Sequence, residues 1–294
     1  MKRNRNNTIL ALLLTFGIAS AFALTYPLSQ SSFAHTFSGD ESAAFLALSR
    51  QIRAELNLVQ ENLPSNITLS QQHAQDAVEH LDVNTTKELA ERNKRVTDDL
   101  TSELNNLQNS LKATSIPSVA NITDQVNNLN DTLAEAISAR IEPDQLNNST
   151  VKALALNDIL GEILEHYGEA QGIEETAGGE GMGEQSHNEN ATSTLTTPTS
   201  TTANETNSNA TIVNESSYQS AKALAGVAVE MFNEIKPLAQ SNASDVVSKL
   251  NSGLTELKQA INNQSSFDTA DKIVDSKIIP NLQTAFNFRL ESSS

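Results

Sequence analysis

The sequence predicts an all-α protein: an antiparallel bundle of about five helices, a disordered linker, and a C-terminal segment of three more helices. Apolar residues recur at steps of three and four over most of the chain, which is the spacing of one helix face. Aromatic residues make up only 4% of the chain and Trp is absent, so Leu, Ile, Val and Ala must build the core, as in helical bundles. No stretch alternates with the period of a β-strand.

Residues 1–34 have the features of an export signal. Basic residues near the start precede an uncharged apolar run over residues 9–24. As a helix this run would rise about 24 Å, less than the ~30 Å hydrocarbon core of a bilayer. Ser32 and Ala34 supply small residues at the −3 and −1 positions, so we expect cleavage after Ala34. An uncleaved anchor is the alternative.

Residues 35–170 are predicted to form the N-terminal bundle. Ser38 and Glu41 make a capping box at the start of the first helix, and Thr85 with Glu88 indicates the start of the third. The expected helices cover residues 38–63, 69–81, 85–111, 117–143 and 150–167.

Residues 171–216 differ sharply in composition from the stretches on either side. They are rich in Gly, Ser, Thr and Asn, and their seven Glu are opposed by no Lys or Arg. Such a stretch has too few apolar side chains to offset the entropy of ordering, so we expect a disordered acidic linker. Residues 217–294 return to helical spacing and predict three amphipathic helices, with faces that include Leu224, Leu254 and Val274.

Sequons for N-glycosylation are frequent beyond the export signal. This excess predicts a sugar-bearing surface on an exported protein. The asparagines are Asn66, Asn84, Asn121, Asn130, Asn147, Asn148, Asn190, Asn204, Asn209, Asn214, Asn242 and Asn263.

Charge and cysteine content exclude several classes of function. The chain has 36 acidic and 19 basic residues and a net charge of -17, which would repel nucleic acid. It has no Cys, so disulfides, thiolate metal sites and thiol nucleophiles are ruled out. Because the familiar nucleophile, phosphate-loop and zinc-protease motifs are also missing, we expect no catalytic site.

Histidines with neighbouring carboxylates are the candidate metal ligands. His73, Asp76 and His80 lie within about 60° of one another on the expected second helix, so Asp76 and His80 could chelate one ion. Glu162 and His166 form a similar pair one turn apart on the fifth helix. The alternative for each group is a set of solvated polar side chains beside the core.

His35 is a further candidate. If cleavage follows Ala34, His35 begins the mature protein, and its α-amine and imidazole could together bind Cu(II). A copper or zinc ion is therefore the expected cofactor, held by some of these residues.

Two resemblances accompany these patterns. The stretches AHTFSGDESAAFLAL, QQHAQDAVEHL and KELAERNKRVTDDL, within residues 34–170, resemble an uncharacterised family of exported helical proteins from ammonia-oxidising archaea. The resemblance implies a cell envelope bounded by an S-layer. The H-A-x-x-A-x-x-H element from His73 to His80 is similar to repeats in small periplasmic metal-binding four-helix proteins of bacteria, which implies sequestration of a divalent metal, particularly copper.

The sequence therefore predicts an exported, N-glycosylated helical-bundle protein of the cell envelope that is not an enzyme and binds a divalent metal such as copper. Its location would be extracellular, at the cell surface or in the pseudo-periplasmic space. The alternative is a structural or interaction protein whose coiled-coil-like stripes bind a second copy or an envelope protein.

Overall fold

The predicted helices form throughout the part of the chain that the computed structural model describes, which is residues 38–113, 118–173, 210–240 and 243–289. Within these ranges every regular element is helical and none is a strand, which confirms the all-α prediction. The predicted export signal and His35 lie outside the described residues, as does most of the predicted linker.

The helices follow one another with short connections, except across residues 171–214. Their bounds are α1 (Gly39–Asn62), α2 (Ile67–Glu79), α3 (Val83–Lys112), α4 (Val119–Arg140), the single turn α5 (Pro143–Leu146), α6 (Ser149–Ala170), α7 (Glu215–Ile235), the 3-10 turn η1 (Lys236–Leu238), α8 (Ser244–Asn262), α9 (Phe267–Ile273), the π-helical turn η2 (Val274–Ile278) and α10 (Ile279–Phe286).

Side-chain caps fix where the first and third helices begin. The Ser38 hydroxyl accepts a hydrogen bond from the Glu41 N–H at 3.2 Å, and the Glu41 carboxylate accepts one from the Ser38 N–H at 2.6 Å. The predicted capping box is thus confirmed. The expected start of the third helix at Thr85 is wrong, because the Asp82 carboxylate accepts from the Thr85 N–H at 2.5 Å and starts α3 at Val83.

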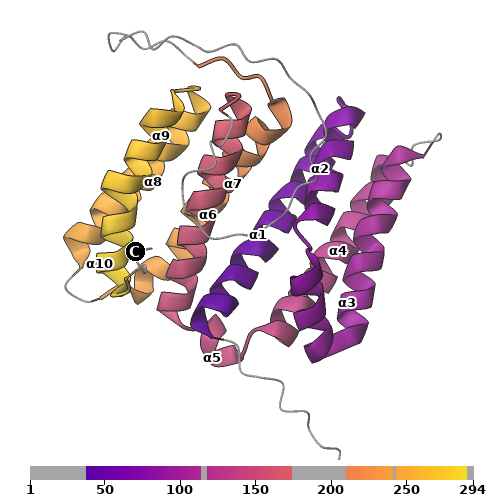
Figure 1. The fold of residues 1–294 in the computed structure, drawn as a ribbon, viewed down its shortest axis with the longest axis horizontal. Coiled ribbons are helices and arrows are strands. Elements are labelled where there is room, and N and C mark those ends of the chain that lie inside the picture. The colour runs from indigo at the N-terminus through magenta and orange to yellow at the C-terminus, as the bar shows by residue number, and fades with distance from the viewer. Residues whose placement is uncertain (1–37, 114–117, 174–209, 241–242, 290–294) are drawn as a thin grey trace, which may run out of the picture. The chain divides into compact units, whose positions relative to one another are not determined.

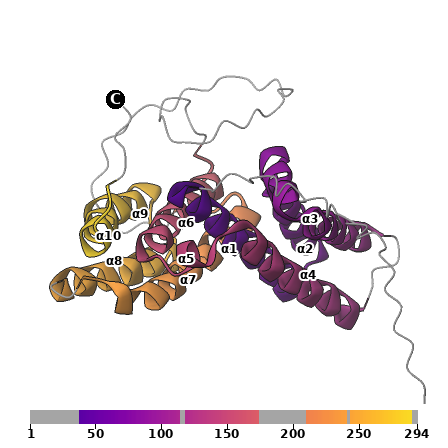
Figure 2. The same cartoon turned by 90° about the horizontal axis from the view of Figure 1, so that it is seen from below.

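α1 lies at the centre of the helix packing and contacts α2, α4, α6 and α7 (Figures 1 and 2). The α3–α4 pair packs against α1 and α2, with α3 on α2 and α4 on α1, and α7 packs most extensively against α6. α8 and the α9–α10 pair complete the other side. All these helices share one hydrophobic core, and the described residues belong to one compact unit.

A buried arginine connects three helices of this core. Arg140, at the end of α4, pairs with Glu88 of α3 at 2.6 Å. Its guanidinium carbon also lies 5.6 Å from the centre of the Phe45 ring on α1. Only 3% of the Arg140 side chain is exposed, so the Glu88 carboxylate compensates a charge that is almost fully removed from water.

The last helix widens to a π-helical turn just before Pro280. Pro280 has no N–H, and in a regular α-helix its ring would clash with the carbonyl of Ser276. The wide turn over Val274–Ile278 accommodates this ring. Gly253 of α8 permits the close contact there, because a Cβ at this position would lie 3.0 Å from Cγ1 of Ile278.

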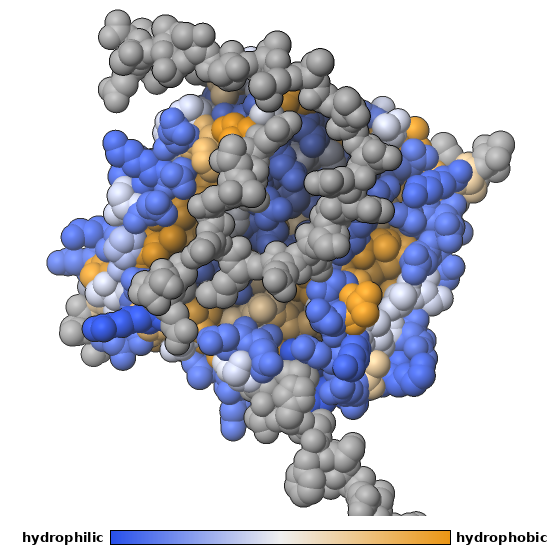
Figure 3. All heavy atoms as spheres, in the orientation of Figure 1, coloured by the Kyte–Doolittle hydropathy of each residue, from blue (hydrophilic) through white to orange (hydrophobic). Residues whose placement is uncertain are grey.

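The apolar faces of the described helices pack against one another inside the protein. On the face shown in Figure 3, hydrophilic side chains cover most of the described surface and hydrophobic ones lie in small groups between them. The large apolar side chains that are exposed in the described ranges are scattered, namely Val83, Val119, Ile173, Val213 and Leu238. No described helix is both long and apolar enough to cross a membrane.

Candidate metal centre

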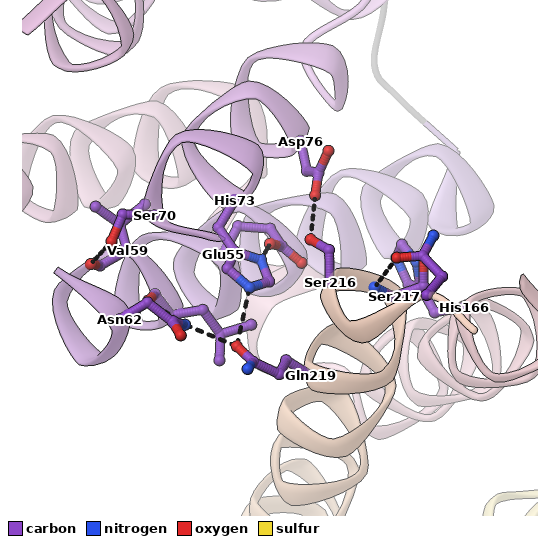
Figure 4. A network of polar contacts seen from close by, with 12 residues as sticks. Glu55, Val59, Asn62, Ser70, His73, Asp76, His166, Ser216, Ser217 and Gln219 are labelled. Atoms are coloured by element: carbon purple, nitrogen blue, oxygen red, sulfur yellow. Dashed lines mark hydrogen bonds and ion pairs between the residues drawn. The ribbon is translucent and has the colours of Figure 1, made fainter. Parts of the chain in front are cut away.

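A polar centre lies inside the core where α1, α2, α6 and the first turn of α7 meet (Figure 4). Ala74 and Ala77 of α2 are buried, and their small side chains let α2 lie close to α1. The Ser70 hydroxyl also donates to the carbonyl of Val59 at 2.9 Å, which ties the start of α2 to α1. The two alanines of the H-A-x-x-A-x-x-H element thus bring its histidines against Glu55 of α1.

A buried ion pair forms the middle of the centre. Nδ1 of His73 lies 2.7 Å from Oε2 of Glu55, and both side chains are 0% exposed. Nε2 of His73 lies 3.2 Å from Oε1 of Gln219, and that oxygen also accepts a hydrogen bond from the Asn62 amide at 2.7 Å. Because Glu55 and the Gln219 oxygen are both acceptors, both nitrogens of His73 donate and the ring is an imidazolium.

The charges of Glu55 and His73 stabilise each other. Burial is the largest single influence on His73 and disfavours its charged form, but the hydrogen bond and charge of Glu55, the hydrogen bond to Gln219 and the charge of Asp76 together outweigh burial and raise the pKa of His73. Burial likewise opposes ionisation of Glu55, while the hydrogen bond and charge of His73 lower the pKa of Glu55. Both shifts favour the charged forms of the pair, a carboxylate on Glu55 and an imidazolium on His73.

Three donor groups converge beside this pair. Glu55, His80 and His166 each present one ligand atom, and these atoms lie within 4.8 Å of one another. Oε1 of Glu55, Nε2 of His80 and Nε2 of His166 are buried and have no hydrogen-bond partner among the described residues, although the Ser220 hydroxyl lies near enough to Glu55 to lower its pKa. We call these three residues the trio. They come from α1, the C-cap of α2 and α6, so the helix packing assembles them.

The two histidines of the trio differ in protonation. Burial lowers the pKa of His80 to about 4, so its ring is neutral at pH 7 and can offer a lone pair. Burial also acts on His166, but the carboxylates of Glu169, Glu55 and Glu162 have the larger effect and raise its pKa. A metal at the trio would therefore compete with a proton for His166, whose raised pKa favours the protonated ring.

Carboxylate support for His166 comes from the next turn of α6. Oε2 of Glu169 lies 3.6 Å from Nδ1 of His166, and the Ser217 hydroxyl of α7 donates to the same oxygen at 2.9 Å. A carboxylate on Nδ1 leaves Nε2 for a metal, which is the usual arrangement around a metal-bound histidine.

The other predicted ligands lie close to the trio but play different parts. Asp76 forms a second group with Glu55 and His73, but both nitrogens of His73 are already hydrogen-bonded there. Asp76 accepts from the Ser216 hydroxyl at 3.4 Å, and burial raises its pKa to about 6. Asp76 and His80, predicted to chelate one ion, are therefore in different groups.

Glu162 stands outside both groups. Burial, followed by repulsion from Glu165, raises the pKa of Glu162 to about 7. Its neighbours include His166, one turn along α6. His35, the remaining predicted ligand, lies outside the described residues.

Sequence reasoning missed Glu55, Gln219 and Ser217. Glu55 sits within the apolar stripe of α1, between Ile52 and Leu56, and a carboxylate in such a position is the one local signal that could have indicated it. Gln219 and Ser217 have no comparable signal, because polar residues are expected in the first turn of a helix.

The fold and the centre define a class: an all-α helical protein with a buried histidine–carboxylate cluster. No protein-family model matches the chain, and no curated protein or solved structure matches it either.

Proposed function

We propose that this chain is an exported, N-glycosylated helical protein of the cell envelope, not an enzyme, which binds one divalent transition-metal ion at Glu55, His80 and His166. The metal proposal rests on one observation: three donor groups converge, and each has a buried ligand atom without a hydrogen-bond partner.

Unpaired buried polar atoms are costly. Each buried donor or acceptor without a partner costs about 1–3 kcal/mol, and a bound cation would satisfy all three at once. Ligand atoms around a tetrahedral Zn²⁺ lie about 3.4 Å apart, given bonds of about 2.0–2.2 Å. Small rotations of the trio, whose atoms lie within 4.8 Å of one another, would reach that geometry.

The donor set favours Zn²⁺ or Cu²⁺. Imidazole nitrogen is a ligand of borderline softness that suits both ions, and one carboxylate would offset part of the charge. Three protein ligands leave at least one coordination position for water.

Export and glycosylation are supported by the basic and apolar pattern of residues 1–34 and by the number of sequons. Among the described sequons, nearly all have an exposed asparagine. These are Asn66, Asn84, Asn121, Asn147, Asn148, Asn214 and Asn263. Asn130 is half-buried, and its side-chain oxygen accepts from Nε of Arg53 at 3.2 Å.

Titration of the full-length secreted protein with Zn²⁺ and Cu²⁺ tests the metal proposal. We expect one ion per chain with micromolar or tighter affinity, and at least a 100-fold loss in a His80→Ala/His166→Ala variant. His187→Ala is the matched control, because this histidine belongs to the predicted linker. His35→Ala tests the predicted N-terminal copper site separately. Binding only in the millimolar range, or unchanged binding in the double variant, would overturn the proposal.

The alternative, association through amphipathic helices, draws less support. The stripes that suggested it pack against one another within the described helices, so they give no separate reason to expect a partner.

A further inference from the structure

The first turn of α7 faces the metal centre with several polar side chains. Ser216 and Ser217 hydrogen-bond to Asp76 and Glu169, and Gln219 contacts His73. Ser220, one residue further, is 0% exposed. In the chain, α7 is the first helix after residues 174–209, so the centre combines residues from both sides of that stretch.

The first hydrogen-bond relay runs from Gln219 to Glu55. Oε1 of Gln219 accepts from Nε2 of His73 at 3.2 Å, and Nδ1 of His73 donates to Oε2 of Glu55 at 2.7 Å. The Asn62 amide fixes the orientation of Gln219 by donating to the same oxygen at 2.7 Å. This relay occupies Oε2 of Glu55 and leaves Oε1 for the site that Glu55 shares with His80 and His166.

The second relay runs from Ser217 to His166. The Ser217 hydroxyl donates to Oε2 of Glu169 at 2.9 Å, and that oxygen lies 3.6 Å from Nδ1 of His166. Glu169 is half-exposed, so without Ser217 its carboxylate would be free to turn into solvent. The relay therefore holds the carboxylate on the Nδ1 side of the ring.

We propose that Gln219 and Ser217 are positioning residues for the metal ligands, each orienting one ligand through one intermediate side chain. This inference rests on the proposed function. Binding is then coupled to the docking of α7: metal affinity depends on the helices after residue 209, and a bound ion holds those helices in place by the same free energy.

Paired substitutions in the full-length protein test the two relays. Gln219→Leu removes the acceptor at similar size, and Gln219→Glu restores it. Ser217→Ala removes the donor, and Ser217→Thr restores it. Gln71→Leu and Ser49→Ala are matched controls, because these side chains donate to the carbonyls of Leu111 at 2.7 Å and Phe45 at 2.7 Å, away from the centre.

Zn²⁺ affinity and the absorption spectrum of bound Co²⁺ are the two readouts. We expect Gln219→Leu and Ser217→Ala each to weaken Zn²⁺ binding 10- to 100-fold and to alter the Co²⁺ ligand-field bands. Ser217→Thr and both controls should keep wild-type spectra and affinities within about threefold, well inside that range. Gln219→Glu adds a charge and loses the amide donor to Glu215, so its readout is the Co²⁺ spectrum, which should match wild type.

The outcomes separate the two proposals. If wild type binds metal and the Leu and Ala variants match it in affinity and spectrum, the positioning role is wrong while the metal site stands. Equal losses in the controls would also refute positioning, because they would trace the effect to general destabilisation. A wild type that binds no metal would overturn both.

Discussion

The buried pair of Glu55 and His73 makes a sharp prediction about stability and pH in the metal-free protein. Glu55→Gln keeps the shape of the side chain and removes its charge. At pH 8.5 His73 of the variant can be neutral, as it is in the unfolded chain with a pKa of 6.5. The cost is then the difference between a charge-assisted and a neutral hydrogen bond, about 1 kcal/mol.

The loss of folding free energy in Glu55→Gln increases at lower pH. In wild type the raised pKa of His73 contributes stability that is fully present below pH 6.5 and is lost as pH rises through the folded pKa. In the variant the buried ring resists protonation, which costs about 1.4 kcal/mol for each pH unit below 6.5. The loss of stability should therefore increase by at least about 1.4 kcal/mol between pH 8.5 and pH 5.5.

Other titratable groups also face Glu55 and respond to the loss of its charge. His166 loses the same attraction and acts in the same direction. His80 is neutral over this range, because its pKa is about 4. Glu55 also repels Asp76 and raises its pKa, so removing the Glu55 charge lowers that pKa and adds to the increase of the loss at lower pH. The comparison is therefore best made in an Asp76→Asn background, which leaves the effect of His73 unmixed with that of Asp76.

Urea unfolding followed by circular dichroism, with a chelator present, measures the effect. Glu88→Gln is the control, because it also removes a carboxylate from a buried cation, but Arg140 stays charged and the loss should not vary over this pH range. A Glu55→Gln loss that is constant or larger at high pH would refute the assigned imidazolium.

Four further outcomes are expected. Leu100→Ala empties a fully buried position of α3 and should cost about 2–5 kcal/mol in urea unfolding; a loss under about 1 kcal/mol would contradict the packing. Gly253→Ala places a Cβ 3.0 Å from Cγ1 of Ile278 and should destabilise by about 1–3 kcal/mol, whereas Gly226→Ala meets no atom within 4 Å and should stabilise. Glycopeptide mass spectrometry should find Asn130 the least occupied of the described sequons, and high occupancy there would argue against the observed packing. Zn²⁺ at 100 times its dissociation constant should stabilise the fold by about 2.7 kcal/mol, reversibly with chelator, and no shift would count against binding to the native state.

Local signals predicted the helices well because helix caps and apolar spacing act over a few residues. The capping box of Ser38 and Glu41 forms as expected, and most of the predicted apolar stripe of α1, α3 and α4 is buried, although Val119 at the start of α4 is exposed. The sequence did not show which of two neighbouring residues would cap a helix, or where a helix would be interrupted. Asp82 caps α3 in place of Thr85, and Asn93 interrupts it with non-helical angles (φ -154, ψ 88), although nothing in the surrounding apolar spacing marks a kink.

Long-range packing could not be predicted in the same way. Each of the last three helices shows one apolar face, but many partners could cover that face equally well. The close fit of α7 against α6 depends on the summed contacts of whole helices, and so does the approach of α8 to η2 at Gly253. These contacts join residues far apart in the chain, so no local sequence pattern indicates them.

Glu55 shows why the candidate metal centre was only half predictable. Its partner His73 lies 18 residues away, and His73 in turn needs Gln219, a further 146 residues along the chain. Replacing a buried ion pair by apolar residues of similar volume is often neutral or stabilising, by up to about 4 kcal/mol. The fold therefore does not need this pair, and the unpaired Oε1 of Glu55 adds a further cost. A cluster that stabilises the core so little, and still holds three free donor groups in one place, is better explained by a ligand that it binds than by the packing that surrounds it.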